Sequence, residues 1–155
     1  LTPGYWQLRQ EDLPAARQAE QAAIVGSLLT LGQRLGYRAE VWVPFDAAWF
    51  EGPQVRAVFA VRWQAIVSEV LALGESTAEA RPYLVIPGGR AALASYKLAH
   101  NPLWQQAVDE AGWWFIKYRH VRQLVDRPEA DEYALRTMVG LDPIVERETA
   151  QLPLF

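Results

Sequence analysis

The sequence predicts an α/β fold: one domain with a central mixed β-sheet flanked by helices. Hydrophobic residues make up 51% of the 155-residue chain, which suits one ordinary domain with a single substantial core. Segments with helical spacing of apolar residues alternate with short segments typical of strands. A hairpin signal precedes that alternation, which favours a sheet with both antiparallel and parallel pairs. We expect the seven tryptophans to fill the core of this domain.

The first expected element is a long helix that ends at Gly36. Asp12 is a suitable N-cap and Pro14 suits the first turn. Apolar residues then keep helical spacing at Ala15, Ala19, Ala22, Ala23, Leu28, Leu31 and Leu35. Glycine after the last of these is a common way for a helix to stop.

Three strands are expected next, followed by a regular alternation. Residues 38–43 alternate charged or aromatic with aliphatic side chains, and the runs 46–50 and 55–63 are joined by a Glu51-Gly52-Pro53 turn. Later strands are expected at Tyr83–Ile86, which is bounded by prolines, and at 113–118. Helices are expected over residues 64–73, 90–100, 101–111, 120–125 and 129–139.

Composition excludes several function classes. The 15 Lys and Arg residues against 18 Asp and Glu give a net charge of −3, so any DNA contact must use a local basic patch. The absence of cysteine excludes disulfides and thiolate metal sites and favours a reducing, cytoplasmic location. No apolar run reaches the ~20 residues of a membrane span. Because Met138 is the sole methionine, we expect the chain to be part of a longer protein or complex.

The hairpin carries the residues that point to chemistry. A metal-dependent phosphodiesterase needs carboxylates that converge on Mg²⁺ and a lysine beside the attacking water. The relevant segments are the Glu20-bearing helix, Val41-Trp42-Val43, Phe45-Asp46-Ala47-Ala48-Trp49, Val58–Arg62, and Tyr83–Pro87 followed by Arg90. Together these segments, within residues 15–125, resemble the PD-(D/E)xK superfamily, which implies a restriction-endonuclease-like sandwich.

This resemblance implies a degenerate active site. Asp46 matches the metal-binding aspartate and Glu20 the helix glutamate, but Ala60 stands in place of the second acid and Arg62 in place of the lysine. Alanine cannot ligate a cation, and arginine stays protonated with a rigid fork of donors. We therefore expect no catalysis and no cofactor. The alternative is an active Mg²⁺-dependent endonuclease in which Lys97 replaces the missing lysine. Without the resemblance, Asp46 would be a turn residue and Glu20 a solvated helix residue.

Basic residues suggest where DNA would bind. Lys117, Arg119 and Arg122, together with His120, follow the aromatic run Trp113-Trp114-Phe115, a mixture suited to phosphates and bases. Arg56 and Arg62 share one strand face, and Arg90 follows the Pro87-Gly88-Gly89 turn, where an anion could bind. A solvated basic rim is the alternative interpretation.

The C-terminal residues 141–155 are expected to form a flexible tail beyond a domain at 1–140. The tail ends in Gln151-Leu152-Pro153-Leu154-Phe155, which resembles the Q-L-x-L-F peptide of bacterial sliding-clamp partners. The binding residues would be Gln151, Leu152, Leu154 and Phe155; alternatively, the peptide folds back as a hydrophobic latch.

The expected function is that of a non-catalytic, DNA-associated nuclease-fold domain of a replication, repair or mobile-element protein, docked on the sliding clamp. A structural module that binds a protein partner is the alternative from a different class.

Overall fold

A computed structural model describes residues 3–77 and 79–140, with side chains from Pro14 onward. The chain forms a five-stranded mixed sheet with helices on both faces, which confirms the expected α/β class. The elements in order are α1 (Pro3–Arg34), β1 (Arg38–Glu40), β2 (Ala47–Glu51), β3 (Gln54–Val61), α2 (Val67–Gly74), β4 (Arg81–Ile86), α3 (Gly88–His100), α4 (Pro102–Ala111), β5 (Trp114–Lys117), α5 (Tyr118–Asp126) and α6 (Glu132–Thr137).

The sheet follows the order β1-β2-β3-β4-β5. The first three strands pair antiparallel, with Ala39 opposite Trp49 and Ala48 opposite Val58. β3, β4 and β5 pair parallel, and helices connect them because parallel neighbours need a long crossover. The carboxyl ends of these three strands therefore meet at one edge of the sheet.

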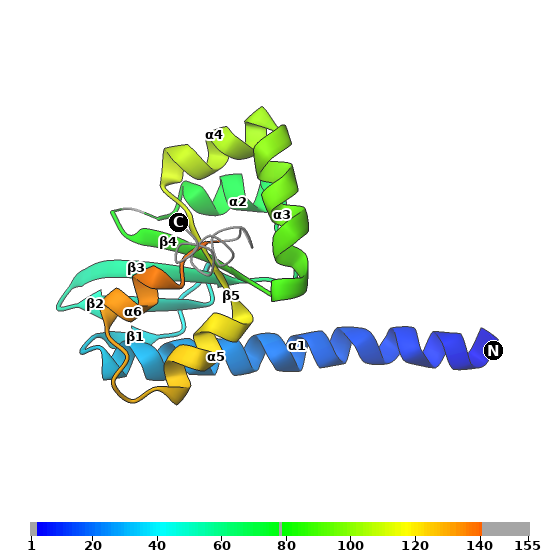
Figure 1. The fold of residues 1–155 in the computed structure, drawn as a ribbon, viewed down its shortest axis with the longest axis horizontal. Coiled ribbons are helices and arrows are strands. Elements are labelled where there is room, and N and C mark those ends of the chain that lie inside the picture. Colours follow the sequence, from blue (N-terminus) through cyan, green and yellow to red (C-terminus); the bar gives the residue numbers. More distant parts are fainter. Residues whose placement is uncertain (1–2, 78, 141–155) are drawn as a thin grey trace, which may run out of the picture.

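The sheet separates two hydrophobic clusters. Helices α2, α3 and α4 cover one face, while α1, α5 and α6 cover the other (Figure 1). Alternate residues of each strand supply the two clusters; for example, Ala60 and Leu84 belong to the first, and Phe59 and Val85 to the second. Figure 1 also shows that α1 continues well beyond the sheet toward the N-terminus.

Aromatic rings form a continuous row on the α1 side of the sheet, which we call the aromatic ladder. Its members are Tyr37, Trp49, Phe59, Tyr83 and Trp114. Neighbouring ring centroids lie between 4.6 Å and 5.7 Å apart. Such pairs add stability beyond the area that they bury. The expectation that the tryptophans fill the core holds for the six whose side chains are described, since all six are buried or half-buried.

Several expected boundaries were wrong, among them the start of the helix expected at 64–73, which begins only at Val67 as α2. Helix α1 begins at Pro3 rather than at Asp12 and contains Pro14. The run Gln7-Leu8-Arg9-Gln10-Glu11 favours helix before that proline, although the proline removes one backbone hydrogen bond and crowds the preceding turn. Residues 41–43 lie outside the strands, since β1 pairs with β2 only as far as Glu40 and Ala48 and Pro44 has no N–H to donate. α6 covers Glu132–Thr137 instead of 129–139, because Asp131 caps it through the N–H of Ala134.

Other signals proved accurate. Asn101 caps α4 by accepting from the N–H of Leu103 at 3.0 Å, as the Asn-Pro pair predicted. The turn between β2 and β3 uses Gly52 with φ of +61°, a conformation that side chains other than glycine rarely adopt. Within the described residues, no helix combines the length and apolar character needed to span a bilayer.

Candidate functional site

The candidate site lies at the edge where β3, β4 and β5 end, here called the carboxyl edge. Arg62 follows β3, and its N–H donates to the carbonyl of Val85 on β4 at 2.9 Å. Asp46 reaches the same edge because it precedes β2, which runs antiparallel to β3. Helices α3 and α5 both begin there.

Arg62 is held between two carboxylates. Its guanidinium forms an ion pair with Oδ2 of Asp46, and its Nε lies 2.6 Å from Oε1 of Glu69 in the first turn of α2. The same Asp46 oxygen accepts from the backbone N–H of Val61 at 2.7 Å. Solvent reaches 22% of the Arg62 side chain. This partly buried cluster, Asp46, Arg62 and Glu69, is called the arginine triad below.

The triad keeps Arg62 charged. Burial alone would lower the pKa of Arg62, but the charge of Asp46 and the hydrogen bond and charge of Glu69 outweigh burial and raise that pKa. Tyr118, the first residue of α5, donates its hydroxyl to the carbonyl of Arg62 at 2.6 Å. Burial, reinforced by the charge of Glu20, raises the pKa of Tyr118 to about 12. The hydroxyl therefore stays a donor at neutral pH.

The residues at this edge do not fit a divalent cation. Ala60 is fully buried in the cluster under α2, α3 and α4 and offers no ligand atom. One oxygen of Asp46 already accepts from Val61 and Arg62, and the positive charge that a metal would bring is supplied by Arg62. In the part of the chain that the structure describes, no three His, Asp or Glu side chains are grouped for metal binding.

The three residues named for an active nuclease, Asp46, Glu20 and Lys97, each contact different neighbours. Glu20 pairs with Arg122 at 2.6 Å, while Asp46 belongs to the triad. The charges of Glu20 and Asp46 both act on the pKa of Tyr118, so α1 does bring Glu20 toward this edge. Lys97 lies on α3 beside a small hollow lined by Gln64, Ala65 and Arg90.

The basic residues expected to contact DNA fall into three groups. Lys117 is 3% exposed, because it faces the α3 side of the sheet like Phe115, two residues earlier. Arg119 is exposed and its side chain passes over Gly88, where an added Cβ would lie 3.9 Å from Cδ of Arg119. Arg122 is neutralised by Glu20. The carboxyl edge thus presents Arg119 and, from α3, Arg90, while Lys117 lies beneath the surface.

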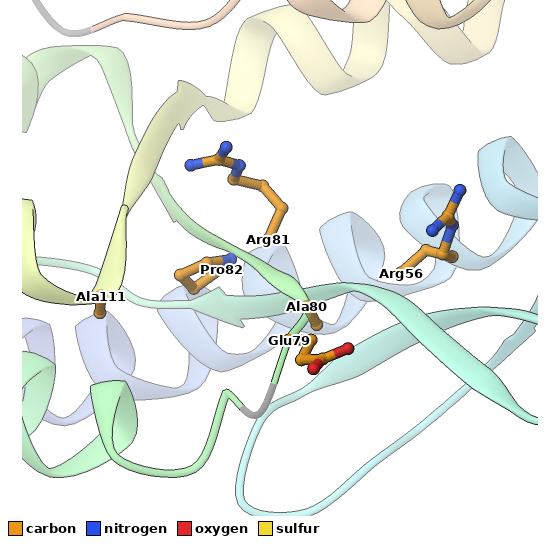
Figure 2. Close-up of a pocket in the computed structure, with 6 residues that line it drawn as sticks. All are labelled: Arg56, Glu79, Ala80, Arg81, Pro82 and Ala111. Carbon is orange, nitrogen blue, oxygen red and sulfur yellow. The ribbon is translucent and has the colours of Figure 1, made fainter.

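Arg56 lies at the other end of β3. It forms a 3.6 Å ion pair with Glu51 and lines a hollow of about 340 Å³ with Glu79, Ala80, Arg81, Pro82 and Ala111. Figure 2 shows the guanidinium groups of Arg56 and Arg81 well apart. Arg81 donates to the carbonyl of Gly112 at 2.7 Å and lies over the Trp114 ring at 4.0 Å. The two arginines therefore do not converge on one ligand.

Besides Tyr118, the sequence did not predict two further residues near the site. Glu69 belongs to a segment that predicts only an ordinary helix, although its place in the first turn of α2, seven residues after Arg62, makes contact between them possible. Arg17 is the second, and its guanidinium lies 4.7 Å from the ring centroid of Trp63. No local pattern could reveal that contact, because it joins α1 to the segment after β3.

Comparison of the chain with protein-family models, with curated proteins and with solved structures finds no match.

Proposed function

We propose that this protein is a DNA-associated domain of the restriction-endonuclease-like class whose nuclease site is not catalytic, and that it serves replication, repair or a mobile element. The observation that carries the proposal is the arginine triad. Arg62 pairs with Asp46 and Glu69 at the edge where the resemblance would put a metal ion and a lysine. A fixed guanidinium supplies positive charge without metal, but it cannot activate water as a bound cation does.

The topology supports the fold part of this proposal. A helix bearing Glu20, an antiparallel hairpin bearing Asp46 and Arg62, a helix, and then a parallel strand follow in the order of the segments on which the resemblance rests. Asp46 and Arg62 are sixteen positions apart in sequence but in contact, as the paired positions of such a site must be.

The basic side chains near the carboxyl edge support the proposal that this domain binds DNA. Arg90 and Arg119 approach the carboxyl edge from the starts of two helices, and Arg17 with Trp63 adds a cation and a ring on the α1 side. Phosphate contacts by such residues give binding that weakens steeply with salt. The overall charge of −3 makes a local surface necessary.

The test pairs retention with cleavage on labelled single-stranded and duplex DNA in the presence of Mg²⁺ or Mn²⁺. We expect salt-dependent binding without cleavage, and a salt slope reduced by about one unit in Arg119→Ala. Arg127→Ala, at the far end of α5, is the matched control and should bind as the unaltered protein does. Cleavage that Asp46→Ala abolishes would overturn the non-catalytic proposal. Absence of both binding and cleavage would favour a module that binds a protein partner.

We also propose that the C-terminal peptide docks on a bacterial sliding clamp. This part rests on sequence alone, because the expected tail at 141–155, with Gln151, Leu152, Leu154 and Phe155, lies outside the described residues. The peptide offers an amide and apolar anchors, which suit a hydrophobic pocket. Titration of a purified bacterial sliding clamp by calorimetry should give binding that the double variant Leu154→Ala, Phe155→Ala loses. Unchanged affinity in that variant would remove the clamp from the proposal while leaving the DNA surface untouched.

A further inference from the structure

The outer face of α3 carries an exposed pair of stacked rings. Tyr96 is 62% exposed, and its ring lies 4.2 Å from that of His100 at an interplanar angle of 24°. Nδ1 of His100 also lies 3.0 Å from the carbonyl oxygen of Tyr96, which holds the imidazole beside the phenol. Leu93, one turn earlier, is half exposed. The core does not account for this surface, because α3 buries its opposite side through Ala91 and Ala94.

Basic residues flank the rings on one side. Arg90 and Lys97, two helical turns apart, line the flank of α3 that faces Gln64 and Ala65. None of the 13 residues of α3 is acidic, so the positive charge of this helix has no compensation within the element. The flank begins at the carboxyl edge, where α3 starts at Gly88.

The other flank of α3 is different in character. Ser95 and Ala99 there line a groove of about 530 Å³ that α4 shares through Gln105 and Asp109. Helix α4 carries Asp109 and Glu110 and no basic residue. A polyanion would therefore be attracted to the Arg90 and Lys97 flank and repelled from the α4 flank, which leaves the Tyr96 ring beside its path.

We propose that the face of α3 formed by Leu93, Tyr96 and His100 binds single-stranded DNA by base stacking, with Arg90 and Lys97 beside the phosphates. This inference rests on the proposed DNA function and names the form of DNA that the surface prefers. Every base has a π-face, so an exposed aromatic pair next to cations binds unpaired bases with little sequence preference. Duplex DNA keeps its bases stacked internally and offers this face only its phosphates.

The test measures the fluorescence anisotropy of three labelled ligands with the full chain: a single-stranded oligonucleotide, an abasic strand of the same length, and a duplex. Tyr96→Ala should weaken binding of the base-bearing single strand by about fivefold or more, the lower range of one stacking contact, and leave the abasic and duplex affinities unchanged. Tyr133→Ala is the matched control, because Tyr133 is also highly exposed but lies on α6. Lys97→Gln should lower the salt slope for the single strand by about one unit.

The outcomes separate this inference from the proposed function. If the unaltered protein binds DNA and Tyr96→Ala binds the base-bearing strand equally well, the stacking surface is disproved and the DNA function stands. If the unaltered protein binds none of the three ligands, both fail. If Tyr96→Ala changes the oligomeric state in size-exclusion chromatography but not DNA affinity, the face contacts a second copy of the chain and the inference is overturned. Circular dichroism of each variant verifies that the fold is retained.

Discussion

Arg62 and Asp46 form an ion pair that ties the end of β3 to the residue preceding β2. The pair is about one-third exposed at Asp46 and less at Arg62, so water screens it only in part. Glu69 adds a second carboxylate from α2. Removal of Arg62 would leave two neighbouring negative charges with poor solvation, which costs more than the loss of an ordinary surface pair.

Arg62→Met should therefore lower the free energy of unfolding by about 1–3 kcal/mol, between the values for exposed and buried pairs. Urea denaturation followed by circular dichroism measures this. Arg56→Met is the control. The pair of Arg56 with Glu51 is longer, at 3.6 Å, and more exposed, so this variant should lower the free energy of unfolding by less than about 1 kcal/mol. Equal losses in the two variants would mean that the triad has no special role in stability.

Arg34, the last residue of α1, caps the C-terminal end of α5. Its NH1 group lies 2.8 Å from the carbonyl oxygen of Val125, in the last turn of α5, where carbonyls lack helical partners. It also lies 3.2 Å from the carbonyl oxygen of Arg127, just beyond the helix. Arg34→Met should destabilise the protein by about 1–2 kcal/mol through these lost charged hydrogen bonds. Thermal unfolding of Arg34→Met and of Arg127→Met, which removes a nearby exposed charge, distinguishes capping from general electrostatics. A similar loss in both would argue against capping.

Gly32 leaves room for the indole of Trp49. A Cβ at position 32 would lie 2.3 Å from Nε1 of Trp49, the atom that donates to the carbonyl of Leu28 at 2.9 Å. Gly32→Ala should destabilise the protein by about 1–3 kcal/mol, because the ring must move and the bond weakens.

Gly26→Ala is the opposite case in the same helix, since nothing lies within 4 Å of its added Cβ. The free energy of unfolding of this variant should rise by up to about 1 kcal/mol, because alanine has the higher helix propensity. Chemical denaturation of both variants gives the comparison, and a stabilising Gly32→Ala would show that the indole can move without loss.

Alkaline pH should weaken the fold through two tyrosines. Burial raises the pKa of Tyr83 to about 12, and burial together with the charge of Glu20 raises that of Tyr118 to about 12. The unfolded chain releases these protons near pH 10. The stability linked to the raised pKa values is fully present below about pH 10 and is lost as pH rises toward 12, by roughly 2–3 kcal/mol per tyrosine.

Urea midpoints measured between pH 9 and pH 11.5 would reveal this loss, with Tyr118→Phe as the comparison. The variant should lose less stability over this pH range than the unaltered protein does. A parallel decline in both proteins would assign the effect to other groups.

Local signals identified most elements, whereas contacts between distant segments could not be read from them. Asn101 and the prolines around Tyr83–Ile86 act within a few residues, so their effect on α4 and β4 was predictable. Pro14 was a misleading signal, because proline suits the first turn of a helix but here lies inside α1, which begins eleven residues earlier. The segment 41–43 alternates like a strand but has no partner strand beyond Glu40, a property of the sheet and not of the segment.

In the candidate site, too, local features were predictable and contacts between distant segments were not. The sequence placed Asp46 and Arg62 on the two arms of one hairpin, and in the structure the two side chains are in contact. The burial of Lys117 was not predictable from its basic neighbours, because it depends on which side of β5 faces α3. Glu69 and Tyr118 reach Arg62 from two helices on opposite faces of the sheet, and only the packing of both layers brings them there.

The aromatic ladder gives this protein an internal optical reporter. Its rings sit on the loop after α1 and on β2, β3, β4 and β5, and they touch only when all these segments are in register. Near-ultraviolet circular dichroism arises from aromatic rings in fixed, asymmetric surroundings and vanishes when side-chain packing is lost, whereas the far-ultraviolet signal follows the helices. Phe45, Phe50 and Trp113 pack on the opposite face and contribute to the same signal. The two spectral regions therefore separate packing of the aromatic side chains around the sheet from formation of the helices.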